Sequence, residues 1–262
     1  MLAPVKVVKI GGNELDQPAW VEACSRALAS ARPLVVVHGG GKAVDALSRR
    51  LGLPVEKREG LRVTTAEVAE AVEMALVAAT SRLLVSALRR AGLDALGVAG
   101  VDGGLFRARI GPGRLGFVGE IVEVRTDVLQ RLLAAGFTPV VAPVAPQPDV
   151  PESPLSAAVP LNVNADHAAA AVAGALGAAE LLFVSNVPGV EVDGVAQPTI
   201  AMAEIETLIA RGVATNGMAA KLRAAAHALR SGARAVRIGD LRMLADPAAG
   251  TRLLASASPQ PA

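Results

Sequence analysis

The sequence predicts an α/β fold in which a mostly parallel sheet is covered by helices on both faces. Short apolar runs rich in valine, isoleucine and leucine alternate with longer stretches of helical periodicity, as in parallel strands joined by helices. Of the 262 residues, 52% are hydrophobic and 26 are glycine, which suffices for a sizeable core. Gly11, Gly39 and Ser185 each follow an apolar run, and ligands bind beyond the carboxyl ends of strands in such sheets.

Each element before Gly136 follows from a local pattern. Val5–Ile10 and Leu34–His38 are apolar runs that predict buried strands. The polar, alternating segment Val55–Val63 predicts an edge hairpin, and Gly111-Pro112-Gly113 predicts the turn of a second hairpin within Leu105–Val124. The remaining elements are a strand at Ala95–Val98 and helices at Pro18–Ala31, Lys42–Leu51, Thr65–Ala91 (the longest, capped by Thr64 or Thr65) and Thr126–Ala135.

The second half continues the alternation. The segment Pro146–Pro160 carries five prolines and predicts a loop, and Asp193-Gly194 predicts a short hairpin at Val190–Val195. We expect disorder after about Leu254. We place a division between two closely packed lobes near Gly177–Glu180, giving residues 1–178 and 179–262. The other elements are strands at Thr138–Ala142, Leu181–Ser185 and Ala235–Ile238 and helices at Ala165–Leu176, Ala203–Arg211 and Met218–Ser231.

Composition excludes several classes of function. The chain has four Phe, one Trp, no Tyr and a net charge of +2, which argues against nucleic-acid binding. We expect the lone Cys24 to be a small core residue, because the chain has no second cysteine for a disulfide and no metal-ligand spacing. No uninterrupted apolar run of 18 residues occurs and a strand begins almost at once, so we expect no membrane span, no signal peptide and a cytoplasmic protein.

Two glycine motifs stand at predicted strand-to-helix junctions. Lys9-Ile10-Gly11-Gly12 would let backbone N–H groups approach an anion. The same residues could equally form a simple glycine turn after a strand, with no ligand bound. His38-Gly39-Gly40-Gly41 is more specific, because three glycines at a helix entry are costly unless a ligand sits there. A phosphate loop of the G-x-x-x-x-G-K-[ST] type, a dinucleotide fingerprint and an esterase are each rejected on spacing or on a missing nucleophile motif. We interpret His38 as a structural turn residue rather than a base.

Charged and amide residues complete a candidate site. Only five of the 26 basic residues are lysine, which makes Lys9 and Lys221 informative, since lysine and arginine are not interchangeable beside a phosphate. Arg62 could grip a carboxylate or be a solvated edge residue. Asn162 and Asn164 could point amides at a ligand or form an Asx turn. Asp166 could cap its helix, and Lys221, placed in the first turn or so of a helix, favours an anion nearby.

The motifs K-x-G-G, HGGG, GLRVT, NVNAD and GM-x-x-K occur in that order, from Lys9 to Gly250-Thr251-Arg252-Leu253. In this the chain resembles the acetylglutamate kinases of the amino-acid kinase family. The resemblance implies an open αβα sandwich, with an N-terminal lobe for the acyl amino acid and dimer contact and a C-terminal lobe for ATP. It implies transfer of phosphate from ATP, with Mg²⁺ bound to the nucleotide and no dedicated metal cage, to the side-chain carboxylate of N-acetyl-L-glutamate in arginine biosynthesis.

The resemblance also implies roles for single residues. Backbone N–H groups of Gly12 and Gly40 would bind the phosphoryl group, with Lys9 and Lys221 neutralising its charge and Asp166 holding both lysines. Four residues would bind the acyl substrate, namely Gly39, Gly40, Arg62 and Asn162. Six would contact ATP, namely Lys9, Gly11, Gly12, Ser185, Asn186 and Lys221. This matches phosphoryl transfer, which needs positioning and electrostatics more than covalent help.

Three alternatives and expectations remain. Asn186 stands where many acetylglutamate kinases have aspartate, and Ser185-Asn186-Val187-Pro188-Gly189 is similar to sister kinases that act on an aminoadipyl or glutamyl group carried by a small acidic protein. Those sisters tend to lose GLRVT and to change HGGG and GM-x-x-K, so free N-acetyl-L-glutamate is favoured. A non-catalytic sensor is disfavoured because both lysines and Asp166 are present. Only eight residues precede Lys9, so we expect a homodimer that arginine does not inhibit strongly; whether a regulatory protein docks is left open.

Overall fold

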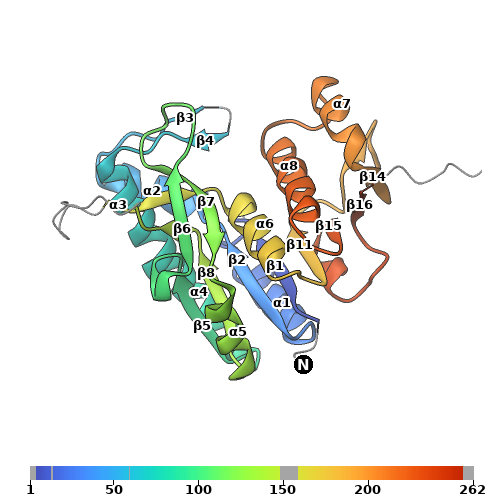
Figure 1. Cartoon of the computed structure of the whole chain (residues 1–262), viewed down its shortest axis with the longest axis horizontal. Coiled ribbons are helices and arrows are strands. Elements are labelled where there is room, and N and C mark those ends of the chain that lie inside the picture. The colour runs from blue at the N-terminus through green and yellow to red at the C-terminus, as the bar shows by residue number, and fades with distance from the viewer. Residues whose placement is uncertain (1–3, 13, 59, 148–158, 256–262) are drawn as a thin grey trace, which may run out of the picture.

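The computed structural model describes residues 4–12, 14–58, 60–147 and 159–255. An eight-stranded sheet in the order β14-β16-β15-β11-β1-β2-β8-β5 runs through it (Figure 1). Every neighbouring pair is parallel except β15 and β16, which confirms the predicted mostly parallel α/β fold. The strands are β1 (Lys6–Ile10), β2 (Leu34–His38), β5 (Ala95–Ala99), β8 (Thr138–Ala142), β11 (Glu180–Val184), β14 (Thr199–Ala201), β15 (Val236–Gly239) and β16 (Thr251–Leu254).

Strand β1 is central to the site because it pairs with β2 on one side and β11 on the other. Lys9 lies opposite Val37 in one ladder and opposite Phe183 in the other. All five residues of β2 and of β8 are buried, which explains their continuous apolar sequence, since a sheet covered on both faces has no polar side. The register brings the carboxyl ends of β1, β2 and β11 to one edge, as predicted.

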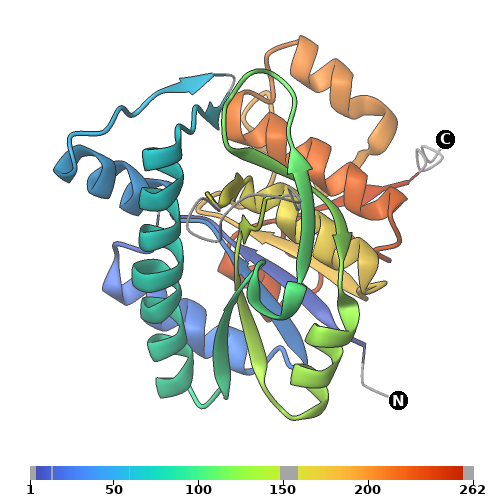
Figure 2. The ribbon, with the colours of Figure 1, turned by 60° about the vertical axis from the view of Figure 1, so that its left-hand side comes forward.

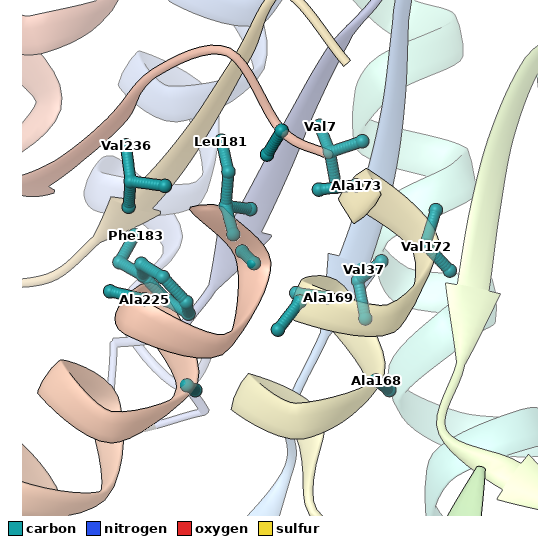
Figure 3. Packing of buried hydrophobic residues seen from close by; sticks show 14 of the residues in the cluster. Val7, Val37, Ala168, Ala169, Val172, Ala173, Leu181, Phe183, Ala225 and Val236 are labelled. Atoms are coloured by element: carbon teal, nitrogen blue, oxygen red, sulfur yellow. The ribbon is translucent and has the colours of Figure 1, made fainter. Parts of the chain in front are cut away.

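Helices cover both faces of the sheet (Figures 1 and 2). One face packs against α1 (Pro18–Ala29) and α4 (Ser81–Arg90), and the other against α5 (Thr126–Ala134), α6 (Ala165–Ala175) and α8 (Asn216–Arg230). Figure 3 shows Val7, Leu181 and Phe183 of the sheet beneath the small side chains of α6 and α8, such as Ala169 and Ala225. Alanine on these faces lets both helices lie close to the strands.

Smaller sheets surround this core. A four-stranded sheet has the order β6-β7-β10-β9, and two hairpins pair β3 with β4 and β12 with β13. All three predicted hairpins are confirmed. The bounds are β3 (Lys57–Arg58), β4 (Leu61–Arg62), β6 (Phe106–Ile110), β7 (Val118–Val124), β9 (Val144–Ala145), β10 (Leu161–Val163), β12 (Glu191–Val192) and β13 (Val195–Ala196), with the remaining helices α2 (Gly41–Arg50) and α7 (Ile205–Ala210).

Some sequence expectations need correction or fall outside the described residues. Strands β9, β10, β14 and β16 were not expected, because each has only two to four residues and is defined by its partner rather than by local periodicity. The central part of the predicted proline-rich loop, residues 148–158, and the tail from residue 256 onward lie outside the description.

The predicted long helix is present but not uniform. It consists of α3 (Ala66–Glu73), a π-helical segment η1 (Met74–Thr80) and α4, and the hydroxyl of its N-cap Thr65 accepts a hydrogen bond from Val68 N at 3.3 Å. Nothing in the apolar sequence of η1 predicts a π turn. Such turns are rare and frequently lie at functional sites.

This helix, Ala66–Arg90, is also long and apolar enough to cross a membrane by length and composition alone. Half of its most apolar 18-residue window is buried inside the protein, against α1, α2, β5 and β8. A core helix passes the same test, and its burial accounts for its composition here.

Arg237 is a buried cation within β15, with 3% of its surface exposed. Its guanidinium donates to both carboxylate oxygens of Glu180, at 2.6 and 3.2 Å. It also donates to the carbonyl oxygens of Met243, Asp246 and Ala249 at 2.8 to 3.0 Å. One side chain therefore joins β15, the start of β11 and the turn that precedes β16.

Candidate active site

A cleft of about 410 Å³ opens beyond the carboxyl ends of β1, β2 and β11. The structure brings together there all the residues predicted to be catalytic or to bind ATP. Its lining includes Lys9, Gly11, Gly12, Gly40, Asp166, Ser185, Asn186 and Lys221. These residues come from five separate segments of the chain, so the fold and not sequence proximity assembles the site.

A second cavity of about 210 Å³ contains the residues predicted to bind the acyl substrate, which are Gly39, Gly40, Arg62 and Asn162. Its walls also include the apolar side chains of Val44, Leu61, Leu76, Val118 and Val163. The two cavities share Gly39, Gly40, Gly41, Asn164 and Ala165. The glycine turn after β2 is thus the boundary at which a group could pass from one cavity to the other.

Lys9, Asp166 and Lys221 form a buried charge cluster, each with less than 10% of its surface exposed. One carboxylate oxygen of Asp166, Oδ1, lies 2.8 Å from Lys9 Nζ and 3.4 Å from Lys221 Nζ. Burial would raise the pKa of the Asp166 carboxyl, but the two ammonium groups outweigh it and hold that pKa below its usual range. Burial, aided by repulsion from Lys9, lowers the pKa of Lys221. Within these three side chains two cations share one carboxylate.

The elements place these three side chains from different directions. Lys9 stands near the end of β1, and Asp166 is the second residue of α6. Lys221 lies in the second turn of α8 rather than the first, and its Nζ is 5.5 Å from the centre of the Phe183 ring. Asp166 does not cap α6; Asn164 does, accepting hydrogen bonds from the N–H groups of residues 166 and 167. The carboxylate of Asp166 is therefore left for the lysines.

The two glycine turns pack against each other. A Cβ atom added to Gly12 would lie 2.6 Å from Gly40 N, so only glycine permits this approach. Within the part of the chain that the structure describes, the N–H groups of Gly12 and Gly40 have no acceptor. Unpaired N–H groups beside two lysines suit a phosphate. Gly11 also lines the cleft, but its N–H already donates to Val184 O at 3.4 Å.

Arg62 is buried, with 8% of its surface exposed, which excludes a solvated edge position. Its Nη2 forms an ion pair with Asp45 and lies 3.5 Å from Gly41 O, while its Nη1 is buried with no partner among the described residues. A buried guanidinium nitrogen without an acceptor is costly, so the pocket suits an anionic ligand. Asn162 Nδ2 donates to Thr64 Oγ1 at 3.1 Å, which joins β10 to the GLRVT segment.

Ser185 and Asn186 lie at the outer end of the cleft, directly after β11. Ser185 is half-buried, and its N–H donates to Gly239 O at 2.8 Å. Asn186 is exposed, with its Oδ1 3.4 Å from Ser185 Oγ. This placement is compatible with contact to a nucleotide rather than to the group being transferred.

Two acidic residues at the site were not singled out from the sequence. Glu14 is buried and lines the cleft, and its position two residues after the first glycine motif was the available signal. Asp45, on α2, pairs with both Arg62 and Lys57 (Nζ to Oδ2, 3.2 Å) and so holds the β3–β4 hairpin onto α2. No local pattern indicates that contact, because its partners follow 12 and 17 residues later.

Among the described residues, no three His, Cys, Asp or Glu side chains gather in a way that could hold a metal ion. The carboxylates that line the cleft are those of Glu14 and Asp166. Mg²⁺ commonly keeps its waters and binds through substrate phosphates instead. The lining of the cleft fits a metal that arrives with a nucleotide.

His38 is fully buried at the end of β2, and its Nδ1 lies 2.9 Å from Gly39 O. Burial lowers its pKa from 6.5 to about 4. A neutral, buried imidazole agrees with a structural role and does not suit a general base.

We expect stability to fall on acidification between pH 6.5 and 4 because of His38. The unfolded chain binds a proton near pH 6.5 but the native imidazole binds one only near pH 4, so stability rises with pH through this window. The difference amounts to about 3 kcal/mol in total. Urea unfolding at several pH values should show a shallower dependence for His38→Asn than for the wild type. Equal slopes would contradict the assignment of a neutral buried His38.

Comparison with known proteins agrees with this geometry. The sequence pattern of the amino acid kinase family matches residues 4–240. An acetylglutamate kinase from Roseiflexus sp. is 45% identical over 260 residues, covering 98% of this chain and 95% of that protein. One from Chloroflexus aurantiacus is 44% identical over 257 residues, covering 96% and 97%. The solved structure of smu.665 from Streptococcus mutans has a TM-score of 0.80 at 28% identity and covers 96% of this chain and 99% of that one. Because the match to the family pattern spans β1 to β15 and every motif of the cleft, the chain belongs to the amino acid kinase family.

Proposed function

We propose that this protein transfers the γ-phosphoryl group of ATP to the side-chain carboxylate of N-acetyl-L-glutamate, forming N-acetyl-L-glutamyl 5-phosphate in arginine biosynthesis. The observation that carries the proposal is that two cavities meet at one glycine turn. One contains two lysines for phosphates, and the other contains a buried arginine with one nitrogen that has no partner among the described residues. Relatives that match nearly the whole chain bear the name acetylglutamate kinase.

The reaction requires no general base, because the nucleophile is already a carboxylate. A carboxylate oxygen bonds to the γ-phosphorus as the bond from that phosphorus to the bridging oxygen of ADP breaks. The N–H groups of Gly12 and Gly40 would bind the transferring group, and Lys9 and Lys221 would neutralise charge on it and on the ADP oxygen. Each such contact contributes about 3 to 4 kcal/mol of transition-state stabilisation by analogy with oxyanion-hole donors. Mg²⁺ bound with ATP adds charge neutralisation.

The two predicted lobes divide these tasks in the proposal. Residues 1–178 supply the acyl-substrate cavity, whose lining ends at Ala165. Residues 179–262 supply Ser185, Asn186 and Lys221 to the nucleotide side of the cleft. Lys9 and Asp166, from the first lobe, meet Lys221 of the second.

A kinase that acts on an aminoadipyl or glutamyl group attached to a carrier protein is the second candidate. The observation that favours it is Asn186, which stands at the rim of the cleft where many acetylglutamate kinases have aspartate. The retained motifs GLRVT, which includes Arg62, HGGG and GM-x-x-K favour the free amino acid instead.

The test is ADP release from MgATP by purified protein with N-acetyl-L-glutamate or with free glutamate, the acyl phosphate being trapped with hydroxylamine. Turnover with the acetylated substrate alone supports the proposal. Silence with both, followed by turnover on an acidic carrier protein bearing the amino acid, would transfer the assignment to the second candidate.

We expect Arg62→Lys to raise the KM for N-acetyl-L-glutamate by about 10- to 100-fold with little change in kcat. A lysine offers one point charge where arginine offers a planar fork, and hydrogen bonds to charged groups contribute about 1.5–3 kcal/mol. Initial rates at varied acyl substrate and saturating ATP measure this. Arg58→Lys, an exposed arginine on the same hairpin, is the matched control and should leave both constants unchanged. A rise in the KM for ATP instead would contradict the assignment of Arg62 to the acyl substrate.

We also propose a cytoplasmic homodimer. Strand β5 is an edge of the main sheet, and large apolar side chains near it are partly exposed, namely Leu83, Leu96 and Phe137. Covering an edge strand and apolar area is a common reason for association. Light scattering after gel filtration should give twice the mass of the chain, and arginine should inhibit weakly. Arginine-binding hexamers would contradict both expectations.

A further inference from the structure

The peptide between Gly39 and Gly40 is fixed by contacts that the reaction itself does not explain. The acceptor in the contact between His38 and Gly39 is a carbonyl oxygen, so the Nδ1 of His38 must carry the proton and donate. The ring is fully buried, and its Nε2 has no partner within the described residues. One hydrogen bond therefore defines both the tautomer of the imidazole and the direction of the Gly39 carbonyl.

That direction determines where the N–H of Gly40 points. In a trans peptide the C=O and the following N–H lie in one plane and point in opposite directions. Holding Gly39 O on the His38 side thus turns the N–H of Gly40 away from it. The nitrogen of Gly40 lies against Gly12, on the wall of the cleft, and its N–H has no acceptor among the described residues.

Side chains of the π-helical segment η1 pack against the Cα of Gly40. A Cβ atom on Gly40 would lie 2.5 Å from Leu76 Cδ2 and 3.0 Å from Thr80 Oγ1, so these side chains occupy the space beside its Cα. Both are buried. The hydroxyl of Thr80 donates to Ala75 O, five residues earlier, at 2.9 Å, which supports the wide turn. A regular α-helix would present residues 76 and 80 in a different relation to the glycine turn.

We propose that His38 and the π turn are positioning residues that lock the Gly39–Gly40 peptide so that the N–H of Gly40 faces the transferring phosphoryl group. The inference rests on the proposed function, since it concerns the same donor. It adds that the donor is set in place before any ligand binds, by one imidazole hydrogen bond and one wide helical turn. Neither His38 nor Thr80 is among the described residues that line the two cavities.

The test compares His38→Leu with His38→Asn, whose Nδ2 can replace the Nδ1–H donor. We expect His38→Leu to lower kcat by roughly 100-fold, as for loss of an oxyanion-type donor, with the KM for ATP and N-acetyl-L-glutamate within about threefold. His38→Asn should restore kcat to within about tenfold of wild type. Binding of MgADP with aluminium fluoride and N-acetyl-L-glutamate should weaken in His38→Leu only, and binding of MgADP alone should not.

A pair at the π turn keeps the proposal testable if His38→Leu does not fold. Thr80→Ser retains the hydroxyl and should retain kcat, whereas Thr80→Val retains the volume, loses the bond to Ala75 O and should lower kcat. Unchanged kcat in folded His38→Leu and Thr80→Val, or equal losses in the Leu and Asn variants, would overturn the proposal.

A readout independent of turnover separates this proposal from the proposed function. In protein labelled with ¹⁵N-glycine, His38→Leu should shift the amide resonance of Gly40 and His38→Asn should leave it near the wild-type position. If wild-type protein does not phosphorylate N-acetyl-L-glutamate while these shifts are seen, the assigned reaction is wrong and the positioning stands. Identical Gly40 resonances in wild type and His38→Leu would refute the positioning directly.

Discussion

Lys221→Ala should lower kcat by about 100- to 1000-fold while the protein remains folded. The loss follows because Lys221 is the only part of α8 proposed to neutralise charge on the departing ADP oxygen, and one such contact contributes about 3 to 4 kcal/mol. The fold should survive because Asp166 keeps Lys9, at 2.8 Å, as a partner. Rates of acyl phosphate formation and the thermal midpoint, measured on the same sample, check both halves.

Two comparisons make this result specific. Lys6→Ala removes a lysine from the opposite end of the same strand as Lys9 and should leave kcat unchanged. Lys221→Arg keeps the charge but replaces a compact ammonium by a planar group, so it should recover only part of the rate. If Lys221→Ala has the wild-type kcat, Lys221 has no part in the mechanism. If the variant does not fold, the cluster of Lys9, Asp166 and Lys221 is needed for stability.

Arg237→Met should reduce the free energy of unfolding by about 3–5 kcal/mol, the loss typical when one partner of a buried ion pair is removed. The change leaves Glu180 without its cation and deprives three carbonyl oxygens of their donor. For a chain of this size the thermal midpoint should fall by about 10 °C. Urea unfolding followed by circular dichroism measures the free energy.

Arg242→Met is the matched control, because Arg242 is exposed and pairs with Asp240 at the surface. Its unfolding midpoint should equal that of the wild type, since exposed pairs contribute little. Below its melting temperature, Arg237→Met should retain the wild-type KM for N-acetyl-L-glutamate, because Arg237 lies outside both cavities. A loss below about 1 kcal/mol would show that the interior of this region admits water.

The sequence was sufficient to recognise those site residues whose type is rare in this chain. Lysine is scarce in this chain and three successive glycines are unusual, so Lys9, Lys221, Gly39 and Gly40 could be recognised, and the structure places all four around one cleft. The sheet could be predicted for a similar reason, since buried parallel strands are continuous apolar runs.

What could not be predicted depends on contacts between distant segments. Three features have no local periodicity that would predict them: the pairing of Asp45 with Arg62, the π turn behind Gly40, and the short strands β14 and β16. In α6, the sequence offered Asp166 as a possible helix cap, and only the geometry showed that Asn164 takes that role and leaves Asp166 for the lysines.

The ladders on both sides of β1 limit how the protein can move. Lys9 belongs to a strand that is paired over five residues with β2 and over five with β11. Continuous hydrogen-bonded strands therefore connect the acyl-substrate cavity to the nucleotide end of the cleft. A hinge between the two halves would have to break one of those ladders. Closure around the substrates should therefore be a shared twist of the whole sheet, together with shifts of the β3–β4 hairpin and α8, and its mechanical stiffness would be set by β1.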